Sequence, residues 1–391
     1  MENKNYIRQN VRLYPNKDQI QFLNQDIGNQ RFVWNHFLSE TKKLYESEKK
    51  FLFFKDTCSL LVDFKKQNEF LQIGVAQALQ QTLRDLEGAL KAGYKQQKGF
   101  PRFKKKSSGG SIRLPQGCSI VDGKLKLPKI GLVKSKGSLP NNFNSVTILR
   151  TPSGKFFASF VVPIILPEKV EIKSSVGIDL NSRHFVVLSE GSAIENPKFL
   201  KQKELRLKRY QRAYSRKQKG SKNQNKARIK LAKQFEKISN SQHNFLEQLT
   251  TNLVKTYDHI SIEDLNVKGM QQFNGRMIGM APFGSFRQKL TWKANKYGKH
   301  LSVVNRFCPT SKVCSECGQE LKLTLKDRWI DCDCGNSLHR DHNAAINIHR
   351  TGTVRIDACG DRKKPTDFSS FRWLSLKQET HHIKGMGSSQ E

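Results

Sequence analysis

Two close pairs of cysteines carry the clearest chemical signal in this chain of 391 residues. The pairs have the forms C-x-x-C and C-x-C, a gap of 14 residues separates them, and Gly318 or Gly335 follows each pair. Four thiolates make the tetrahedral donor set of a structural Zn²⁺ site, and the glycines suit the tight turns that aim each pair at one ion. We therefore predict one structural Zn²⁺. Ligation by His339 or Asp333 in place of one cysteine is the less favoured alternative. The predicted ligands are Cys314, Cys317, Cys332 and Cys334.

Three acidic residues stand where apolar segments end or a helix begins. Asp179 follows VGI, Glu263 follows HISI, and Asp341 precedes the Ala-Ala helix in RDHNAAINI. A single acid in such a place is usually a turn or cap residue. Three of them in a strongly basic chain favour a divalent-metal site, because clustered carboxylates repel one another unless a cation lies between them. Strand alternation should aim the neighbouring Asp264 at the opposite face from Glu263.

Such a carboxylate cluster has a defined chemistry. Two Mg²⁺ ions held by Asp179, Glu263 and Asp341 could polarise a scissile phosphate, generate hydroxide from water and stabilise the leaving 3′-oxygen. Mn²⁺ could substitute for Mg²⁺ at such a site.

The charge of the chain indicates a polyanionic partner. The sequence has 69 Lys and Arg against 34 Asp and Glu, a formal net charge of +35. Nucleic acid is the expected partner. A membrane is disfavoured because no apolar run is long enough to cross one. The N-terminal MENKNY does not have the pattern of a signal peptide, so a reducing prokaryotic cytoplasm, with nucleoid association when bound to DNA, is the expected location.

The first hundred residues read as a strand followed by helices. Apolar alternation predicts a strand over 1–14, and Pro15 suits the first turn of a helix. The stripe of that helix is expected to end at Gly28. A second helical stripe runs from Val75 to Leu90.

The chain changes character at Gly99. The basic and aromatic segment GFPRFKKK is followed by short alternating segments with turn signals at 122–123, 139–142 and 152–154. This pattern predicts a small antiparallel barrel or sandwich. If the strand at 1–14 joins it, the helical region is an insertion.

From residue 175 onward the pattern becomes α/β. Strands are predicted around Asp179, at 184–189, around Glu263 and at 300–307, with a helix at about 284–297. Residues 201–233 hold 14 Lys and Arg and one acid, and Gly220-Ser221 should divide them into two helices. So many positive charges without counter-charge favour contact with nucleic acid.

These segments together resemble the TnpB family of transposon-associated RNA-guided nucleases, relatives of type V CRISPR effectors. GIDLNSRHFVVLS, SIEDLNVKGM, the paired cysteines and RDHNAAINI resemble its RuvC-type nuclease domain of RNase H fold. IENPKFL with the basic residues through 233, and upstream RLYPNKDQIQFLNQDIGNQRFVWN and GFPRFKKK, extend the resemblance to about residues 6–350. His339 and Cys308 depart from the family pattern, but neither belongs to the acidic triad.

The resemblance implies a role for each part of the chain. It implies a wedge β-barrel at 1–14 and 99–170, a helical recognition domain at 15–98, and a RuvC-like domain at 171–351. The last would contain a basic helical hairpin at 199–238 and a zinc ribbon at 308–340, and 352–391 would be a disordered tail. It further implies that Asp179, Glu263 and Asp341 are catalytic, that a transposon-end RNA is the guide, and that double-stranded DNA is the target beside a short motif.

Phosphate contacts are expected from the basic segments, with Phe100, Phe103, Tyr210 and Tyr214 available for stacking on bases. The candidate phosphate-binding residues are Arg102, Lys104, Lys105, Arg206, Arg209, Arg212, Arg216, Lys217, Lys222 and Arg340.

Three other functions fit parts of the pattern. A guided repressor that binds without cleaving should lack one of the three acids, and all three are present. A DDE-type transposase shares the two-metal chemistry, but a zinc ribbon before a final Asp argues against it. A miniature type V CRISPR effector differs in genomic context, where a repeat array would replace a transposon end.

Overall fold

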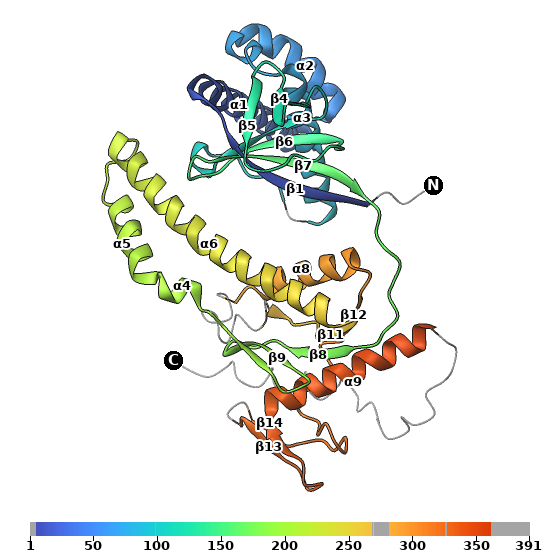
Figure 1. Ribbon diagram of the computed structural model, residues 1–391. Coiled ribbons are helices and arrows are strands. Elements are labelled where there is room, and N and C mark those ends of the chain that lie inside the picture. Colours follow the sequence, from blue (N-terminus) through green and yellow to red (C-terminus); the bar gives the residue numbers. More distant parts are fainter. Residues whose placement is uncertain (1–4, 98, 268, 270–280, 325–326, 361–391) are drawn as a thin grey trace. The chain divides into compact units, whose positions relative to one another are not determined.

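The computed structural model of the chain describes residues 5–97, 99–267, 269, 281–324 and 327–360 (Figure 1). It divides into two compact units. The first comprises Met1–Ile165 with Lys203–Asn240, and the second comprises Leu166–Gln202 with Ser241–Glu391. Among the described residues, no helix combines the length and apolarity that crossing a bilayer requires.

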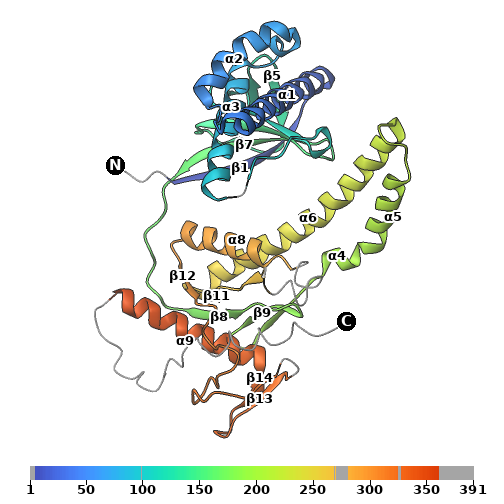
Figure 2. The same cartoon turned by 180° about the vertical axis from the view of Figure 1, so that it is seen from behind.

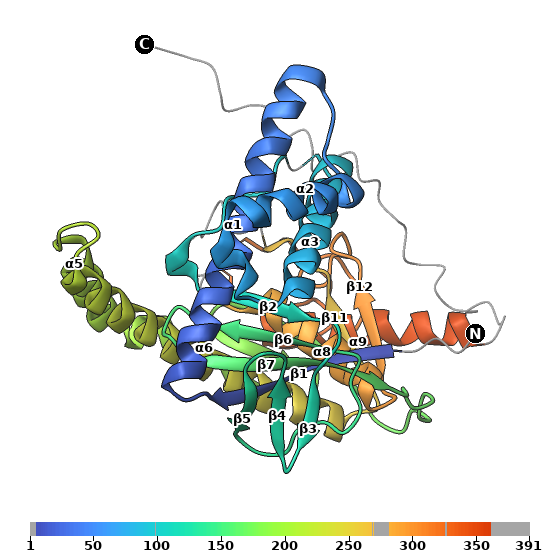
Figure 3. The same cartoon turned by 90° about the horizontal axis from the view of Figure 1, so that it is seen from above.

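An antiparallel sheet of seven strands organises the first unit (Figure 3). Its order is β2-β6-β7-β1-β5-β4-β3. The N-terminal strand pairs with β7 from Asn5↔Ile164 to Leu13↔Phe156, which confirms that it joins the sheet. The described ladders leave β2 and β3 as edges, so the seven strands form an open sheet where a barrel was predicted. The strands are β1 (Asn5–Tyr14), β2 (Gly110–Leu114), β3 (Ser119–Val121), β4 (Lys124–Leu127), β5 (Gly131–Ser135), β6 (Ser145–Arg150) and β7 (Phe156–Ile164).

Helices inserted between β1 and β2 build their own apolar core. A capping box between Asn16 and Gln19 begins the first helix, as two reciprocal hydrogen bonds show. That helix continues through Gly28, so the predicted end there is wrong. Its buried face goes on to Val33, Phe37 and Leu38, and this burial exceeds the cost of about 1 kcal/mol for an interior glycine. The elements are α1 (Lys17–Glu48), α2 (Phe54–Gln67), α3 (Ala76–Lys95) and the short 3₁₀ turns η1 (Glu69–Gln72) and η2 (Lys106–Ser108).

The basic stretch forms two helices, as predicted, with the break at Gly220. Helix α5 spans Glu204–Ser215 and α6 spans Lys222–Thr256, so α6 begins in the first unit and ends in the second. Gly220 has φ +84°, a conformation that glycine adopts without steric cost. Arg228 anchors this part of α6 to the first unit, because its guanidinium donates to the carbonyls of Ser107 and Pro152.

A mixed sheet of five strands organises the second unit, in the order β10-β9-β8-β11-β12. The three strands β8, β11 and β12 are parallel, and β9 and β10 add antiparallel partners. The end of α6 together with α8 covers one face of the sheet and α9 lies along the other (Figure 2). The elements are β8 (Ser175–Asp179), β9 (His184–Leu188), β10 (Ala193–Glu195), α4 (Phe199–Gln202), β11 (His259–Glu263), α8 (Phe283–Lys296), β12 (His300–Val304), β13 (Trp329–Asp331), β14 (Ser337–His339) and α9 (Arg340–Gly360).

The C-terminal helix differs from the predicted boundary. Helix α9 runs to Gly360, past the predicted start of a tail at 352. Residues 361–391, which make up the rest of that predicted tail, lie outside the described residues.

Candidate functional site

The two faces of the sheet in the second unit differ in chemistry. Val176 and Ile178 of β8, with Ile260 and Ile262 of β11, belong to the apolar core that α6 and α8 complete. Because side chains alternate along a strand, the intervening residues of β8 and β11 face the other way, toward α9. These intervening residues are small, polar or acidic: Ser175, Gly177, Asp179, His259, Ser261 and Glu263.

Helix α9 packs against this polar face through two glycines. A Cβ added to Gly177 would lie 2.5 Å from the backbone nitrogen of His349, and closer still to the carbonyl oxygen of Ala345. A Cβ added to Gly352 of α9 would lie 2.5 Å from the Cβ of Ser261. The absence of side chains at both positions therefore sets how close the helix approaches β8 and β11.

The close approach brings two acids from distant parts of the sequence together. Asp179 ends β8, and Asp341 lies in the first turn of α9. The side-chain amide of Asn181 donates to Oδ2 of Asp179 at 3.3 Å and to Oδ2 of Asp341 at 3.0 Å. A single amide nitrogen thus bridges two of the three predicted catalytic carboxylates.

The electrostatics place Glu263 in the same group. Burial above all, together with the charges of Asp341 and Glu263, raises the pKa of Asp179 to about 7, although the hydrogen bond from Asn181 acts in the opposite direction. Burial and the neighbouring Asp264 raise the pKa of Glu263 to about 7. Asp179 therefore lies close enough to feel the charges of both other predicted acids, and the adjacent parallel strands β8 and β11 carry Asp179 and Glu263 at the same end of the sheet.

Asp264 has a different environment. It forms ion pairs with Arg287 of α8 and with Arg306, and Arg306 Nε donates to its Oδ2 at 3.0 Å. Hydrogen bonds from these two arginines lower the pKa of Asp264. This pairing with α8, on the apolar-core side of the sheet, agrees with the predicted alternation.

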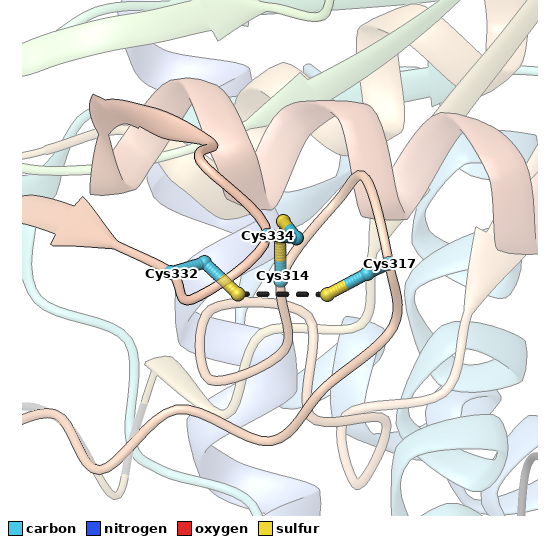
Figure 4. A group of neighbouring side chains, drawn as sticks. All are labelled: Cys314, Cys317, Cys332 and Cys334. Atoms are coloured by element: carbon cyan, nitrogen blue, oxygen red, sulfur yellow. Dashed lines mark hydrogen bonds between the residues drawn. The ribbon is translucent and has the colours of Figure 1, made fainter.

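The four predicted zinc ligands meet at one point (Figure 4). The ligand atoms of Cys314, Cys317, Cys332 and Cys334 all lie within 4.8 Å of one another, and no other group of three or more such ligands is this compact among the described residues. The Sγ–Sγ distance is 3.7 Å for Cys314–Cys334 and 3.5 Å for Cys317–Cys332. A tetrahedron with Zn–S bonds of about 2.3 Å has edges of about 3.8 Å. The cluster therefore fits Zn²⁺.

Two asparagines of α9 connect this cluster to the helix that carries Asp341. Asn343 accepts from the backbone nitrogen of Ser315 and donates to the carbonyl of Val313, both at 2.7 Å. Asn347, one turn later, donates to the carbonyls of Thr310 and Val313. Residues at i and i+4 share a helix face, so one face of α9 holds the backbone that leads into the first cysteine pair, Cys314 and Cys317. The cysteine cluster and Asp341 therefore share one rigid support.

The predicted phosphate-binding residues near position 100 lie along α1. Trp34 donates to the carbonyl of Arg102, and the side chain of Asn35 makes two hydrogen bonds to the backbone of Lys104. The ammonium of Lys104 lies 3.6 Å from the ring centroid of Trp34, a cation–π contact. Lys105 follows with an exposed side chain. Of the aromatics, Phe100 and Phe103 lie beneath the ammonium of Lys42.

The other predicted phosphate-binding residues are on or beside the basic helices. Tyr210 accepts from Arg206, and Tyr214 is half-buried. Arg340 is the exception, since it begins α9 and its guanidinium donates to the carbonyl of Thr324. The remaining ones are exposed: Arg209, Arg212, Arg216, Lys217 and Lys222.

Comparison with known proteins identifies the class. Residues 150–274 match a family described as "Probable transposase", and residues 283–348 match one described as "Cas12f1-like, TNB domain". Residues 5–50 match a family described as "Helix-turn-helix domain", although here they form β1 and a single long helix.

Full-length relatives extend the match over nearly the whole chain. A "Putative RNA-guided DNA endonuclease" of Streptomyces pristinaespiralis is 33% identical over 382 residues, which cover 94% of each chain. The "Putative RNA-guided DNA endonuclease InsQ" of Escherichia coli (strain K12) is 28% identical, over 85% of this chain and 88% of the relative. The chain belongs to the TnpB family.

Solved structures support the fold. A Cas12f1 complex with sgRNA and target DNA aligns with a TM-score of 0.54 and 14% identity, over 89% of this chain and 99% of that one. The mini-RNA-guided endonuclease CRISPR-Cas_phi3 aligns with a TM-score of 0.52 and 12% identity, over 89% of this chain and 92% of that one. The chain therefore has a Cas12f-like mixed α/β fold of several parts.

Three residues that support the site were not predicted. Asn181, Asn343 and Gly177 all lie in the motifs quoted above, but no role was predicted for them. Asn343 has a signal that could have been used, since Asn recurs four positions later at the spacing of a helix face. The bridging position of Asn181 depends on tertiary structure.

Proposed function

We propose that this protein is an RNA-guided DNA endonuclease that cuts target DNA by two-metal-ion RuvC-type chemistry. The observation that carries the proposal is the convergence of Asp179, Glu263 and Asp341 on one end of a mixed sheet, in a chain of net charge +35. The names of the relatives support the guided activity. The guide would be an RNA from the transposon end, and cleavage would occur beside a short target-adjacent motif.

The carboxylates fit divalent cations of the Mg²⁺ type. All three offer only oxygen donors, which Mg²⁺ and Mn²⁺ prefer. Burial and mutual repulsion raise the pKa of Asp179, and a cation among the acids would offset both costs. Asp179, Glu263 and Asp341 would hold two such ions, which would supply polarisation of the scissile phosphate and stabilisation of the leaving 3′-oxygen.

The protein's own part in this chemistry is positioning. Asp179 and Glu263 are fixed by rigid strands, and Asp341 is fixed by a helix that packs on those strands through Gly177 and Gly352. These supports would hold the phosphate and the ions in reacting geometry, which contributes much of the rate of such reactions. The zinc cluster would support α9 through Asn343.

Recognition would be divided between base pairing and charge. Guide RNA would select the target strand by base pairing, while the protein would hold the backbones, the same division of labour as in a Cas9-type nuclease. The exposed arginines of α5 and the segment around Lys105 would contact phosphates. In this proposal the seven-stranded sheet acts as the wedge domain, α1–α3 as the recognition domain, and the second unit with the basic hairpin as the RuvC domain of RNase H fold.

The test replaces each acid and compares binding with cleavage. Asp179→Ala, Glu263→Ala and Asp341→Ala should abolish cleavage while guided DNA binding persists, because they remove metal ligands and no backbone contact. Asp264→Asn is the matched control, since that acid adjoins Glu263 but pairs with Arg287 and Arg306. Cleavage by the Asp179→Ala protein at nearly the wild-type rate would refute the assignment.

A further inference from the structure

The side chain of Asn181 is held in one orientation by its own loop. Its Oδ1 accepts from the backbone nitrogens of Arg183 at 3.1 Å and of His184 at 2.8 Å. A carboxamide has two donor hydrogens on nitrogen and two acceptor positions on oxygen. With the oxygen committed to two backbone donors, the nitrogen must point the other way. A flipped amide would set its nitrogen against two N–H groups and its oxygen against two carboxylates.

The committed nitrogen uses its two hydrogens on two acids. One goes to Oδ2 of Asp179 and the other to Oδ2 of Asp341, residues 160 positions apart in the sequence. All four hydrogen-bonding positions of the amide are therefore occupied. Such a fully satisfied polar group is rigid, and it fixes the rotation of both carboxylates relative to each other.

The same contacts are selective between the oxygens of each carboxylate. Asn181 donates to Oδ2 in both cases, so its two amide hydrogens bond one oxygen of each carboxylate. A carboxylate that is held by one oxygen is hindered from turning both oxygens to a cation. One-oxygen ligation suits Mg²⁺, which demands near-ideal octahedral geometry and keeps several waters, whereas Ca²⁺ accepts more oxygens and two-oxygen carboxylates.

We infer that Asn181 is a positioning residue that makes Asp179 and Asp341 offer one oxygen each and so selects Mg²⁺-type cations over Ca²⁺. This inference rests on the proposed function, because it takes the two acids as metal ligands. Partners of ligating groups commonly tune a metal site in this way, and their loss costs about 10–100-fold in affinity.

The test measures cation binding directly, without cleavage as the readout. Free Mn²⁺ is followed by electron paramagnetic resonance in the protein–RNA complex, and Mg²⁺ and Ca²⁺ are titrated as competitors. In the Asn181→Ala protein the Kd for Mn²⁺ should rise about 10-fold or more. The Kd for Ca²⁺ divided by the Kd for Mg²⁺ should fall, because the site would discriminate less against Ca²⁺. Ser192→Ala is the matched control, because the hydroxyl of Ser192 donates to Glu190 in the same unit and its loss should leave both values unchanged.

A second variant separates this role from that of the loop. Asn181→Asp keeps the acceptor for the nitrogens of Arg183 and His184, so the turn is retained, but it replaces the bridging donor with a charged oxygen. Its melting temperature should match wild type in Mg²⁺, while its selectivity should also move toward Ca²⁺.

Two outcomes distinguish a wrong role for Asn181 from a wrong assignment of the metal site. If wild type binds Mn²⁺ and the Asp179→Ala protein does not, but both Asn181 variants keep the wild-type selectivity, the inference about Asn181 is wrong and the proposed function stands. If wild type shows no Mn²⁺ binding that depends on Asp179, the proposed metal site itself fails.

Discussion

Replacement of Gly177 by alanine should move Asp341 away from Asp179, although neither acid is itself changed. The new Cβ would lie 2.5 Å from the backbone nitrogen of His349 and 2.7 Å from the Cβ of that residue, whereas ordinary contact begins at 3.4 Å. Backbone atoms cannot rotate away as a flexible side chain does. Helix α9 must therefore move off β8 by about 1 Å, and Asp341, one turn before Ala345, moves with it.

This displacement has two expected magnitudes. A misplacement of about 1 Å at a reacting centre costs about 10²-fold in rate, so single-turnover cleavage should fall by about that factor. Overpacking costs about 1–3 kcal/mol, which should lower the melting temperature by a few degrees for a unit of this size. Guided DNA binding should be nearly unchanged, because no proposed phosphate contact lies on β8.

The assay compares this variant with Gly284→Ala. A Cβ at Gly284, in α8 of the same unit, meets nothing within 4 Å, so this control should match wild type in rate and stability. Gly352→Ala tests the same interface from the helix side, where the added Cβ would lie 2.5 Å from the Cβ of Ser261. Wild-type cleavage by the Gly177→Ala protein, at the wild-type melting temperature, would refute the reasoning about how α9 is positioned.

Other predictions follow from the remaining contacts. Metal analysis should find about one zinc per chain, and Cys332→Ser should lose that zinc together with stability and cleavage; retention of all three would contradict the cluster. Burial raises the pKa of Glu247, but hydrogen bonds from Lys289 and Lys293 outweigh it and lower that pKa to about 2. The depressed pKa contributes stability above about pH 4.5, which is lost as the pH falls toward 2; solvent screening limits it to about 1–2 kcal/mol, because the carboxylate is 39% exposed. Glu247→Gln should therefore be less stable than wild type at pH 7 and equal to it near pH 2. An equal difference in stability at both pH values would exclude the ion pairing. Without RNA, the protein should have a lower melting temperature and bind DNA weakly, with a steep dependence on salt. A melting temperature that RNA does not change would argue against destabilising repulsion among the positive charges of the chain.

The zinc cluster and the basic hairpin were predictable because their signals are local. Four sulfurs need only the right spacing to reach one ion, and this constraint shows directly in the positions of Cys314 and Cys332. The break at Gly220 was also predictable, since a glycine at positive φ between two charged helical runs is a local feature. The face of the sheet on which Asp179 and Glu263 lie was predictable too, because side chains alternate between the two faces along a strand.

Features that depend on tertiary contacts were not predictable in the same way. Gly28 resembles a helix terminator locally, but the apolar face beyond it packs on α3 and carries the helix through. Closure of the first sheet depends on whether β2 and β3 pair, which no local pattern encodes. The role of Asn181 arises only when α9 brings Asp341 to it across the sheet.

Cleavage of one plasmid with a matched or a mismatched guide shows whether RNA directs this nuclease to its target. The plasmid carries the target beside a randomised flank, and the purified protein is supplied with transposon-end RNA and Mg²⁺. Cutting at the target is expected with the matched guide. No cutting is expected with the mismatched guide, after RNase treatment before assembly, or by the Asp179→Ala protein. Cutting that is indifferent to the guide, or that survives RNase treatment, would contradict an RNA-guided function and favour a transposase-like enzyme.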